Sequence, residues 1–275
     1  MSHPSSLTRG LTLGLTLGID TTAASPGIAL CQAGCVVGQR HSPPGERARG
    51  ERLVGDLSDL LQEIGSAPSQ LSGISVVQGP GSYTGVRVGL AMARGLAFPA
   101  ALPVVGLDAL SVLAAAGPGR GEGQRLAVLD AGRGRFYGAL FSSDEQILVA
   151  PFHAASLEEL CEAVSSHLSG ERVTVVTEGT TVGDTVGDTV GDTVGDTVGD
   201  TVGDTVAEAL KSADGALSIA AVLGPIARAT FVAIEGEKRI ADGRGGAAEA
   251  ILPIYLAGIS AKPNRNGVVA RPGPV

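Results

Sequence analysis

Two aspartates stand where a magnesium-bound nucleotide could be held. Asp20 in the sequence GIDTT and Asp130 in LDAG each end the first predicted strand of a repeated block. An Asp at such a turn can position a magnesium nucleotide, or it can cap a hairpin turn. The turn after Asp20 contains no glycine, and Thr21 occupies a place where a phosphate would need close access to the backbone. We therefore treat Asp20, Thr21 and Asp130 as candidate remnants of phosphate-binding turns.

The strongest local motif is GPGSYTGVR. It follows a predicted strand and opens a helix, where backbone N–H groups can hold an anion. Val86 stands where a Walker loop requires Lys, and Thr84 where a dinucleotide fingerprint requires its third glycine. Two interpretations stay open: a phosphate contact, or a tight glycine turn with Ser82 or Thr84 as the helix N-cap. The candidate loop residues are Gly79, Pro80, Gly81, Ser82, Tyr83, Thr84, Gly85 and Arg87.

Other groups with catalytic chemistry are scarce. The four histidines lack the spacings of metal ligands, and no Gly-x-Ser-x-Gly elbow is present. The three cysteines, Cys31, Cys35 and Cys161, are an odd and sparse set, which favours a reducing compartment over a disulfide scaffold. The sequence predicts no metal site and no nucleophile–base pair.

Two predicted helices flank these turns. Apolar residues recur at helical spacing from Leu53 to Ile64. In the helix after the loop, small residues repeat every fourth position from Gly85 to Ala97. Glycine is unfavourable inside a helix, so a closely packed neighbour should compensate, either within this chain or on another protein. In the second case the interface residues are Leu53, Leu57, Leu60, Leu61, Val86, Gly89, Leu90 and Ala93.

The order of predicted elements is duplicated. Three strands followed by alternating helices and strands occur over residues 15–106 and again over 107–260. The second block is interrupted by six copies of TVGD over 181–204, which we interpret as a flexible, solvated insertion. Residues 1–14 and 261–275 are predicted to be a flexible extension and tail.

Composition limits the class of protein. Of 275 residues 44% are hydrophobic and only 3% aromatic, so an aliphatic core is expected. The net charge is −8, six charges of which come from the TVGD repeat, and this balance argues against a basic nucleic-acid-binding domain. Apolar stretches end well short of a membrane span, and the N-terminus does not resemble a signal peptide.

The motifs together resemble the TsaB (YeaZ) family. The resemblance is carried by GIDTT, GPGSYTGVRVGLAMARGLA, LDAGRGRFYGALF and a late PIYL, and runs from about Leu15 to Leu256 with the repeat outside it. It implies an α/β fold of two related lobes, of the actin/Hsp70/sugar-kinase (ASKHA) type. That fold is consistent with the duplicated order of elements.

The resemblance also implies a role. Proteins of this family are non-catalytic subunits of the bacterial machinery that makes threonylcarbamoyl-adenosine beside the anticodon of tRNA. They pair through their first two helices with TsaD, the catalytic paralogue, and the ATPase TsaE then joins. The implied protein is a cytoplasmic scaffold, without membrane attachment or a cofactor of its own. ATP and magnesium would be used by the assembled complex, and tRNA would be contacted only through that complex. When TsaD is absent, the scaffold could form a homodimer.

Some positions depart from the family pattern. Gly132 and Arg135 stand where the family often has Arg and Glu, and Arg49 lies near the place of a common histidine. The competing hypothesis is an independent enzyme, either a phosphotransferase of the same fold or a peptidase. On the scaffold hypothesis, Gly89→Leu or Leu57→Asp should abolish complex formation in a chain that stays folded.

Overall fold

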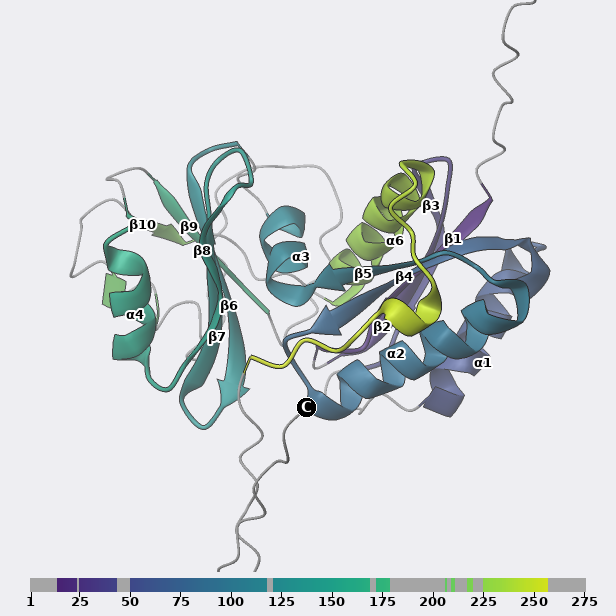
Figure 1. Ribbon diagram of the computed structural model, residues 1–275, viewed down its shortest axis with the longest axis horizontal. Helices are drawn as coiled ribbons and strands as arrows, with labels where there is room; N and C mark the ends of the chain where they lie inside the picture. Colours follow the sequence, from purple (N-terminus) through teal and green to yellow (C-terminus); the bar gives the residue numbers. More distant parts are fainter. Residues whose placement is uncertain are drawn as a thin grey trace, which may run out of the picture.

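The structure, a computed structural model, describes residues 14–23, 25–43, 50–117, 121–168, 172–178, 206, 209–210, 217–219 and 225–256. Residues 1–13 of the predicted extension, Arg49, the TVGD insertion and the predicted tail over 261–275 lie outside these ranges. The described residues form two lobes, each built on a five-stranded sheet (Figure 1).

The first sheet has the strand order β3-β2-β1-β4-β5. Its strands are β1 (Leu15–Asp20), β2 (Gly27–Gln32), β3 (Cys35–His41), β4 (Leu71–Gly79) and β5 (Val104–Asp108). The strands β1, β2 and β3 form an antiparallel meander, whereas β1, β4 and β5 run parallel. Side chains alternate along β1, so Leu17 and Ile19 face one side of the sheet and Gly18 the other.

Helices cover both faces of this sheet. On the face of Leu17 and Ile19 lie α1 (Gly50–Glu63) and α2 (Tyr83–Ala97), and on the opposite face lies α6 (Pro225–Ala241). A side chain at Gly18 would meet the backbone nitrogen of Ala233 at 2.5 Å, so the missing Cβ lets α6 lie directly against the strand.

The second lobe repeats the plan of the first. Its sheet has the order β10-β9-β6-β7-β8. Its elements are β6 (Gln124–Gly132), β7 (Arg135–Phe141), β8 (Ile147–Ala154), α4 (Leu157–Ser165), β9 (Val173–Thr177) and β10 (Leu217–Ile219). Again three strands form an antiparallel meander and β6, β9 and β10 run parallel. The predicted duplication of a two-lobed α/β fold is therefore confirmed.

The short helix α3 (Ala109–Ala116) joins the lobes and lies between the two sheets in Figure 1. Its buried Leu110 and Leu113 share one hydrophobic cluster with Leu107 of β5 and with Ala127 and Leu129 of β6. Because apolar residues from both lobes are buried together, the lobes share part of their hydrophobic core.

The end of the chain returns to the first lobe. The sequence predicts residues 107–260 as the second lobe, but α6 packs on β1, β2 and β4. Beyond it, Gly246 exchanges two backbone hydrogen bonds of 2.8 and 2.9 Å with Val104 of β5. Ala229 and Ala233 of α6 fit the flat face around Gly18, and this long-range complementarity leaves no local sequence signal. None of the helices formed by the described residues is long and apolar enough to cross a membrane.

Candidate functional site

The signature loop, residues 79–87, connects β4 to α2. The Ser82 hydroxyl accepts a hydrogen bond of 3.2 Å from the Gly85 backbone N–H, so Ser82 is the N-cap of α2 and Thr84 lies within the helix. Gly79 and Gly81 have φ angles of +111° and +148°, which L side chains rarely adopt. The glycines here shape a tight turn that delivers the chain into a capped helix.

Two of the three glycines of α2, Gly85 and Gly89, face Thr21. The Thr21 hydroxyl donates a hydrogen bond of 2.6 Å to the Gly85 carbonyl oxygen, and the backbone N–H of Ser82 donates to the Thr22 carbonyl oxygen at 3.0 Å. A Cβ at Gly85 would overlap the Thr21 carbonyl oxygen, and one at Gly89 would overlap its hydroxyl. The small-residue stripe is thus covered within the same chain, Gly85 and Gly89 by the turn after β1 and Ala93 and Ala97 by the hydrophobic core.

A buried ion-pair cluster lies beside this contact. The fully buried guanidinium of Arg228 on α6 places Nε 2.7 Å from the Asp20 carboxylate and pairs through Nη1 with Glu178, which follows β9. Its Nη2 donates to the Thr22 hydroxyl at 2.9 Å. That hydroxyl and the Thr22 N–H both donate to the other carboxylate oxygen of Asp20. One arginine therefore joins carboxylates from both lobes.

The position of this cluster follows from the topology. Asp20, Asp108 and Glu178 come at the carboxyl ends of parallel strands, the place where open α/β sheets bind ligands. Burial raises the pKa of the Asp108 carboxyl, while hydrogen bonds from Ser111 and the charge of Arg228 act in the opposite direction. A magnesium-bound phosphate would need these carboxylates and the space between them, which the Arg228 guanidinium takes. The residues present do not fit a nucleotide at this joint.

Asp130 has a different place. Its carboxylate accepts a hydrogen bond of 2.6 Å from the Gly132 N–H and is exposed, as expected of a residue that caps the β6–β7 turn. Gly132 takes φ +79°, and the Arg135 Nε donates to its carbonyl oxygen at 3.0 Å. The two departures from the family pattern therefore shape this hairpin together, apart from the Asp20 cluster.

The eight interface residues named from the sequence are all buried within the chain. Leu53, Leu57, Leu60 and Leu61 of α1, and Val86, Leu90 and Ala93 of α2, belong to the core cluster that contains Leu17 and Ile19. Gly89 lies against Thr21. These groups cannot touch a partner while the first lobe is folded, so the internal alternative holds for them. Docking of the two helices on another protein stays a prediction that needs other side chains.

The outward face of α1 and α2 offers such side chains. Val54 on α1 is 51% exposed, and Phe98 just beyond α2 is 76% exposed. Between Tyr83 and Phe98 the exposed positions of α2 include Ala91 and Gly95, and Gly95 has open space where a Cβ would be. This face was not predicted from the sequence, where its only signal is the presence of small residues on the polar side of an amphipathic helix.

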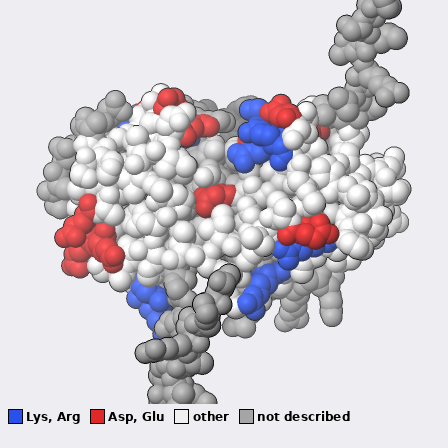
Figure 2. Space-filling model, viewed as in Figure 1, with Lys and Arg blue, Asp and Glu red and all other residues white. Residues whose placement is uncertain are grey.

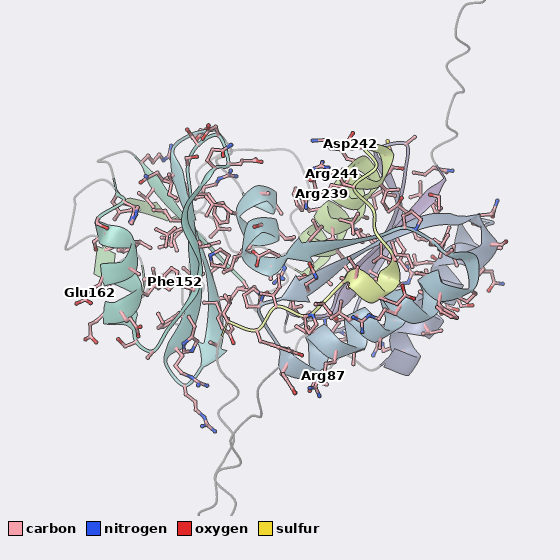
Figure 3. All side chains as sticks on the ribbon, viewed as in Figure 1. Arg87, Phe152, Glu162, Arg239, Asp242 and Arg244 are labelled. Carbon is pink, nitrogen blue, oxygen red and sulfur yellow. The ribbon has the colours of Figure 1, made fainter. Side chains whose placement is uncertain are left out.

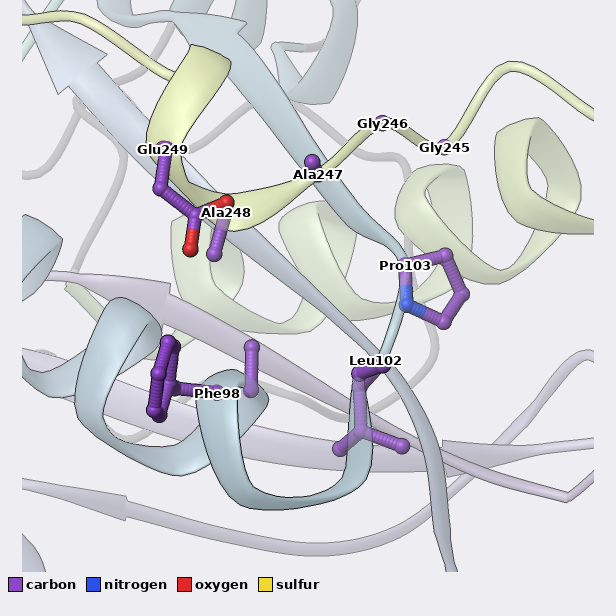
Figure 4. Close-up of a pocket in the computed structure, with 10 residues that line it drawn as sticks. Phe98, Leu102, Pro103, Gly245, Gly246, Ala247, Ala248 and Glu249 are labelled. Carbon is purple, nitrogen blue, oxygen red and sulfur yellow. The ribbon is translucent and has the colours of Figure 1, made fainter.

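The remaining features offer little chemistry. Among the described residues no group of three or more His, Cys, Asp and Glu side chains is placed to hold a metal ion. A cavity of about 450 Å³ lies beside the end of α2, lined by residues such as Leu102, Pro103 and Glu249 (Figure 4). Glu249 is the one ionisable side chain in that lining, so the cavity holds no acid–base pair.

Two duplicated lobes that meet at the carboxyl ends of their parallel strands define a two-lobed protein of the actin/Hsp70/sugar-kinase class. A family model described as "TsaD: tRNA N6-adenosine threonylcarbamoyltransferase" matches residues 45–165. The tRNA threonylcarbamoyladenosine biosynthesis protein TsaB of Escherichia coli (strain K12) is 33% identical over 165 residues, 58% of this chain and 69% of that protein. The protein of the same name from Bacillus subtilis (strain 168) is 34% identical over 130 residues, 47% of this chain and 56% of that protein.

A solved structure agrees with these relatives. YeaZ from Pseudomonas aeruginosa superposes with a TM-score of 0.63 at 21% identity, covering 88% of this chain and 100% of that one. The chain belongs to the TsaB (YeaZ) family.

Proposed function

We propose that this chain is a non-catalytic subunit for the formation of threonylcarbamoyladenosine in tRNA, acting in the cytoplasm by docking on a TsaD-type transferase. The names of the E. coli and B. subtilis relatives support the pathway. The observation that carries the docking role is the outward face of α1 and α2, where small and apolar residues are left exposed after the inner faces have filled the core.

The geometry of this face suits another helix. Gly55 on α1 and Gly95 on α2 each have nothing within 4 Å of a Cβ position, and Ala91 is one helical turn before Gly95. Small exposed residues let two helix backbones approach closely, while Val54 and Phe98 supply apolar area around them. About 22 Å of helix surface separates Tyr83 from Phe98, enough to receive about four turns of a partner helix.

Charge on this face is divided between the helices. The exposed side of α1 carries Arg52, Asp59 and Glu63, of which Glu63 pairs with Arg40 of β3, whereas α2 contains Arg87 and Arg94 and no Asp or Glu. Figure 2 shows the basic atoms along α2. A paralogue with similar helices can match acidic with basic positions, and the TsaD family model covers both helices of this chain. The division of charge thus favours a partner of the same fold, with self-pairing as the weaker alternative when TsaD is absent.

The ion-pair cluster supports the absence of a cofactor of its own. Arg228 pairs with both Asp20 and Glu178 and occupies the space between them in the joint, so the chain by itself should not bind ATP. ATP and magnesium are then used elsewhere in the assembled complex, with a TsaE-type ATPase as third component. An independent phosphotransferase would instead bind ATP tightly without any partner protein.

Reconstitution tests the proposal. The chain, a TsaD-type protein, a TsaE-type protein, ATP, threonylcarbamoyl-adenylate and tRNA are combined, and each is omitted in turn while modified nucleoside is quantified. We expect modification to need the chain, and the chain alone to modify nothing. Micromolar ATP binding by the isolated chain in isothermal titration, or modification at full rate without it, would refute the proposal.

A further inference from the structure

A three-residue cluster on the surface brings together two motifs of the family that are far apart in the sequence. Tyr83 and Arg87 belong to the signature loop and α2, and Tyr255 belongs to the late PIYL motif. The two tyrosine rings have centroids 5.3 Å apart, and the Arg87 guanidinium carbon lies 4.0 Å from the Tyr83 ring centroid. Arg87 also donates a hydrogen bond to the Tyr83 hydroxyl. Figure 3 shows Arg87 pointing outward from α2.

Hydrogen bonds to its backbone hold residues 248–254, the segment that leads to Tyr255, against β4 and α2. Gln78 Nε2 donates to the Leu252 carbonyl oxygen at 2.6 Å, and the Ile254 N–H donates to the Gln78 carbonyl oxygen at 2.8 Å. Arg94 donates to the carbonyl oxygens of Ala248 and Ile251. Because these bonds fix residues 248–254 onto β4 and α2, the cluster is preorganised and little conformational entropy remains to be lost on binding.

The cluster is exposed and carries an uncompensated charge. Tyr83 is 45% and Tyr255 40% exposed, and Leu252 nearby is 62% exposed. None of the ion pairs formed within the described residues includes Arg87, and α2 contains no carboxylate. A guanidinium stays protonated in proteins, so the charge of Arg87 is permanent. Exposed Tyr and Arg side chains are the residue types that dominate binding energy in protein interfaces.

We infer that Tyr83, Arg87 and Tyr255 form a docking point for a carboxylate side chain of the TsaD-type partner, an inference that rests on the proposed function. The guanidinium is held by two tyrosines with N–H groups left to donate, and a carboxylate is the protein group that complements them. The cluster lies at the start of α2, at one end of the helical face described above. The docking surface therefore extends beyond the two helices to the segment that carries Tyr255.

Binding of the full chain to a TsaD-type protein, measured by isothermal titration at low and high salt, tests the inference. We expect Arg87→Gln to weaken binding by about 30-fold, the loss typical of a hot-spot arginine in a protein interface. Arg87→Lys should recover part of that loss, and Tyr255→Ala should weaken binding because the guanidinium loses its support. The wild-type affinity should fall more steeply with salt than that of Arg87→Gln.

Arg133→Gln is the matched control, since it removes one exposed arginine from the second lobe without touching α2. Thermal unfolding establishes that each variant is folded. If Arg87→Gln and Arg133→Gln both bind like the wild type, the docking point is refuted and the proposed function stands. If the wild-type chain does not bind, both fail. If Arg87→Gln binds the partner normally but the assembled complex retains less tRNA, the cluster contacts RNA and the inference is overturned.

Discussion

The hydroxyl of Thr21 donates a hydrogen bond to the carbonyl oxygen of Gly85, 64 residues further along the chain. This contact brings a candidate phosphate turn and the signature loop together, and each fills the space that a phosphate would need in the other. The glycines of GPGSYTG are therefore explained by backbone packing within the first lobe.

The two kinds of glycine in α2 should respond differently to the same substitution. Gly85→Ala places a Cβ on the Thr21 carbonyl oxygen and should destabilise the fold by about 1–3 kcal/mol or more. Gly95→Ala enters open space and should stabilise the helix by up to about 1 kcal/mol. Urea unfolding of both variants measures the difference, and equal midpoints would contradict the packing described for Gly85.

Loss of the buried guanidinium should be costly. Arg228→Met leaves the Asp20 and Glu178 carboxylates without their partner, and breaking a buried ion pair in this way costs about 3–5 kcal/mol. Arg239→Met on the same helix is the control, because its pair with Glu235 is part-exposed and worth about 0.3–0.5 kcal/mol. Denaturant unfolding gives both values.

Where Arg228→Met does not fold, the double variant with Asp20→Asn provides the test. Removal of the uncompensated charge should recover part of the stability. A double variant no more stable than the single one would show that Arg228 acts through packing rather than through charge.

Substitutions on the inner and outer sides of α1 and α2 should separate folding from docking. Gly95→Leu adds bulk to the outward face, so we expect a folded chain that no longer pairs with a TsaD-type protein. Gly89→Leu and Leu57→Asp, for which the sequence predicts a folded chain, should instead unfold the first lobe because both positions are buried. Circular dichroism and co-purification distinguish these outcomes, and wild-type pairing by Gly95→Leu would argue against the helical face.

Cys31 gives a pH-dependent prediction. Burial, followed by the adjacent Glu237 carboxylate, raises the pKa of the Cys31 thiol to about 12 from its usual 9.0. From pH 9 to 12 the unfolded chain ionises this thiol and the folded chain does not, so its contribution to stability is complete below pH 9 and falls as pH rises. At pH 8 the exposed Cys35 should be alkylated long before Cys31. Mass spectrometry of the labelled peptides checks the order, and Glu237→Gln should shorten the delay.

Local patterns were sufficient for much of the fold. The apolar spacing from Leu53 to Leu61 correctly indicates a helix, and Ser156 caps α4 by accepting from the Glu159 N–H, an arrangement that a Ser-x-x-Glu sequence favours. The duplicated order of strands and helices likewise predicts two sheets with the same plan. Each helix or strand is indicated by residues a few positions apart, so these elements can be predicted from the sequence alone.

The candidate site could be predicted only in part from local sequence patterns. A helix with one apolar face looks the same whether that face meets its own sheet or a partner, so Leu57 and Leu90 could not be assigned to the core from spacing alone. Arg228 stands in no motif, and its partners Asp20 and Glu178 come from two different lobes. Only the topology, with parallel strands ending at one joint, brings these charges together.

The return of α6 to the first sheet has a consequence for synthesis on the ribosome. Until residue 241 has left the exit tunnel, the face of β1, β2 and β4 around Gly18, Ala29 and Ser75 has no cover. The amino-terminal half therefore cannot complete its core as it emerges, and must wait for the whole second lobe to be translated. A nascent chain stalled between the lobes would present an open sheet face to chaperones, although all five strands of that sheet had already been synthesised.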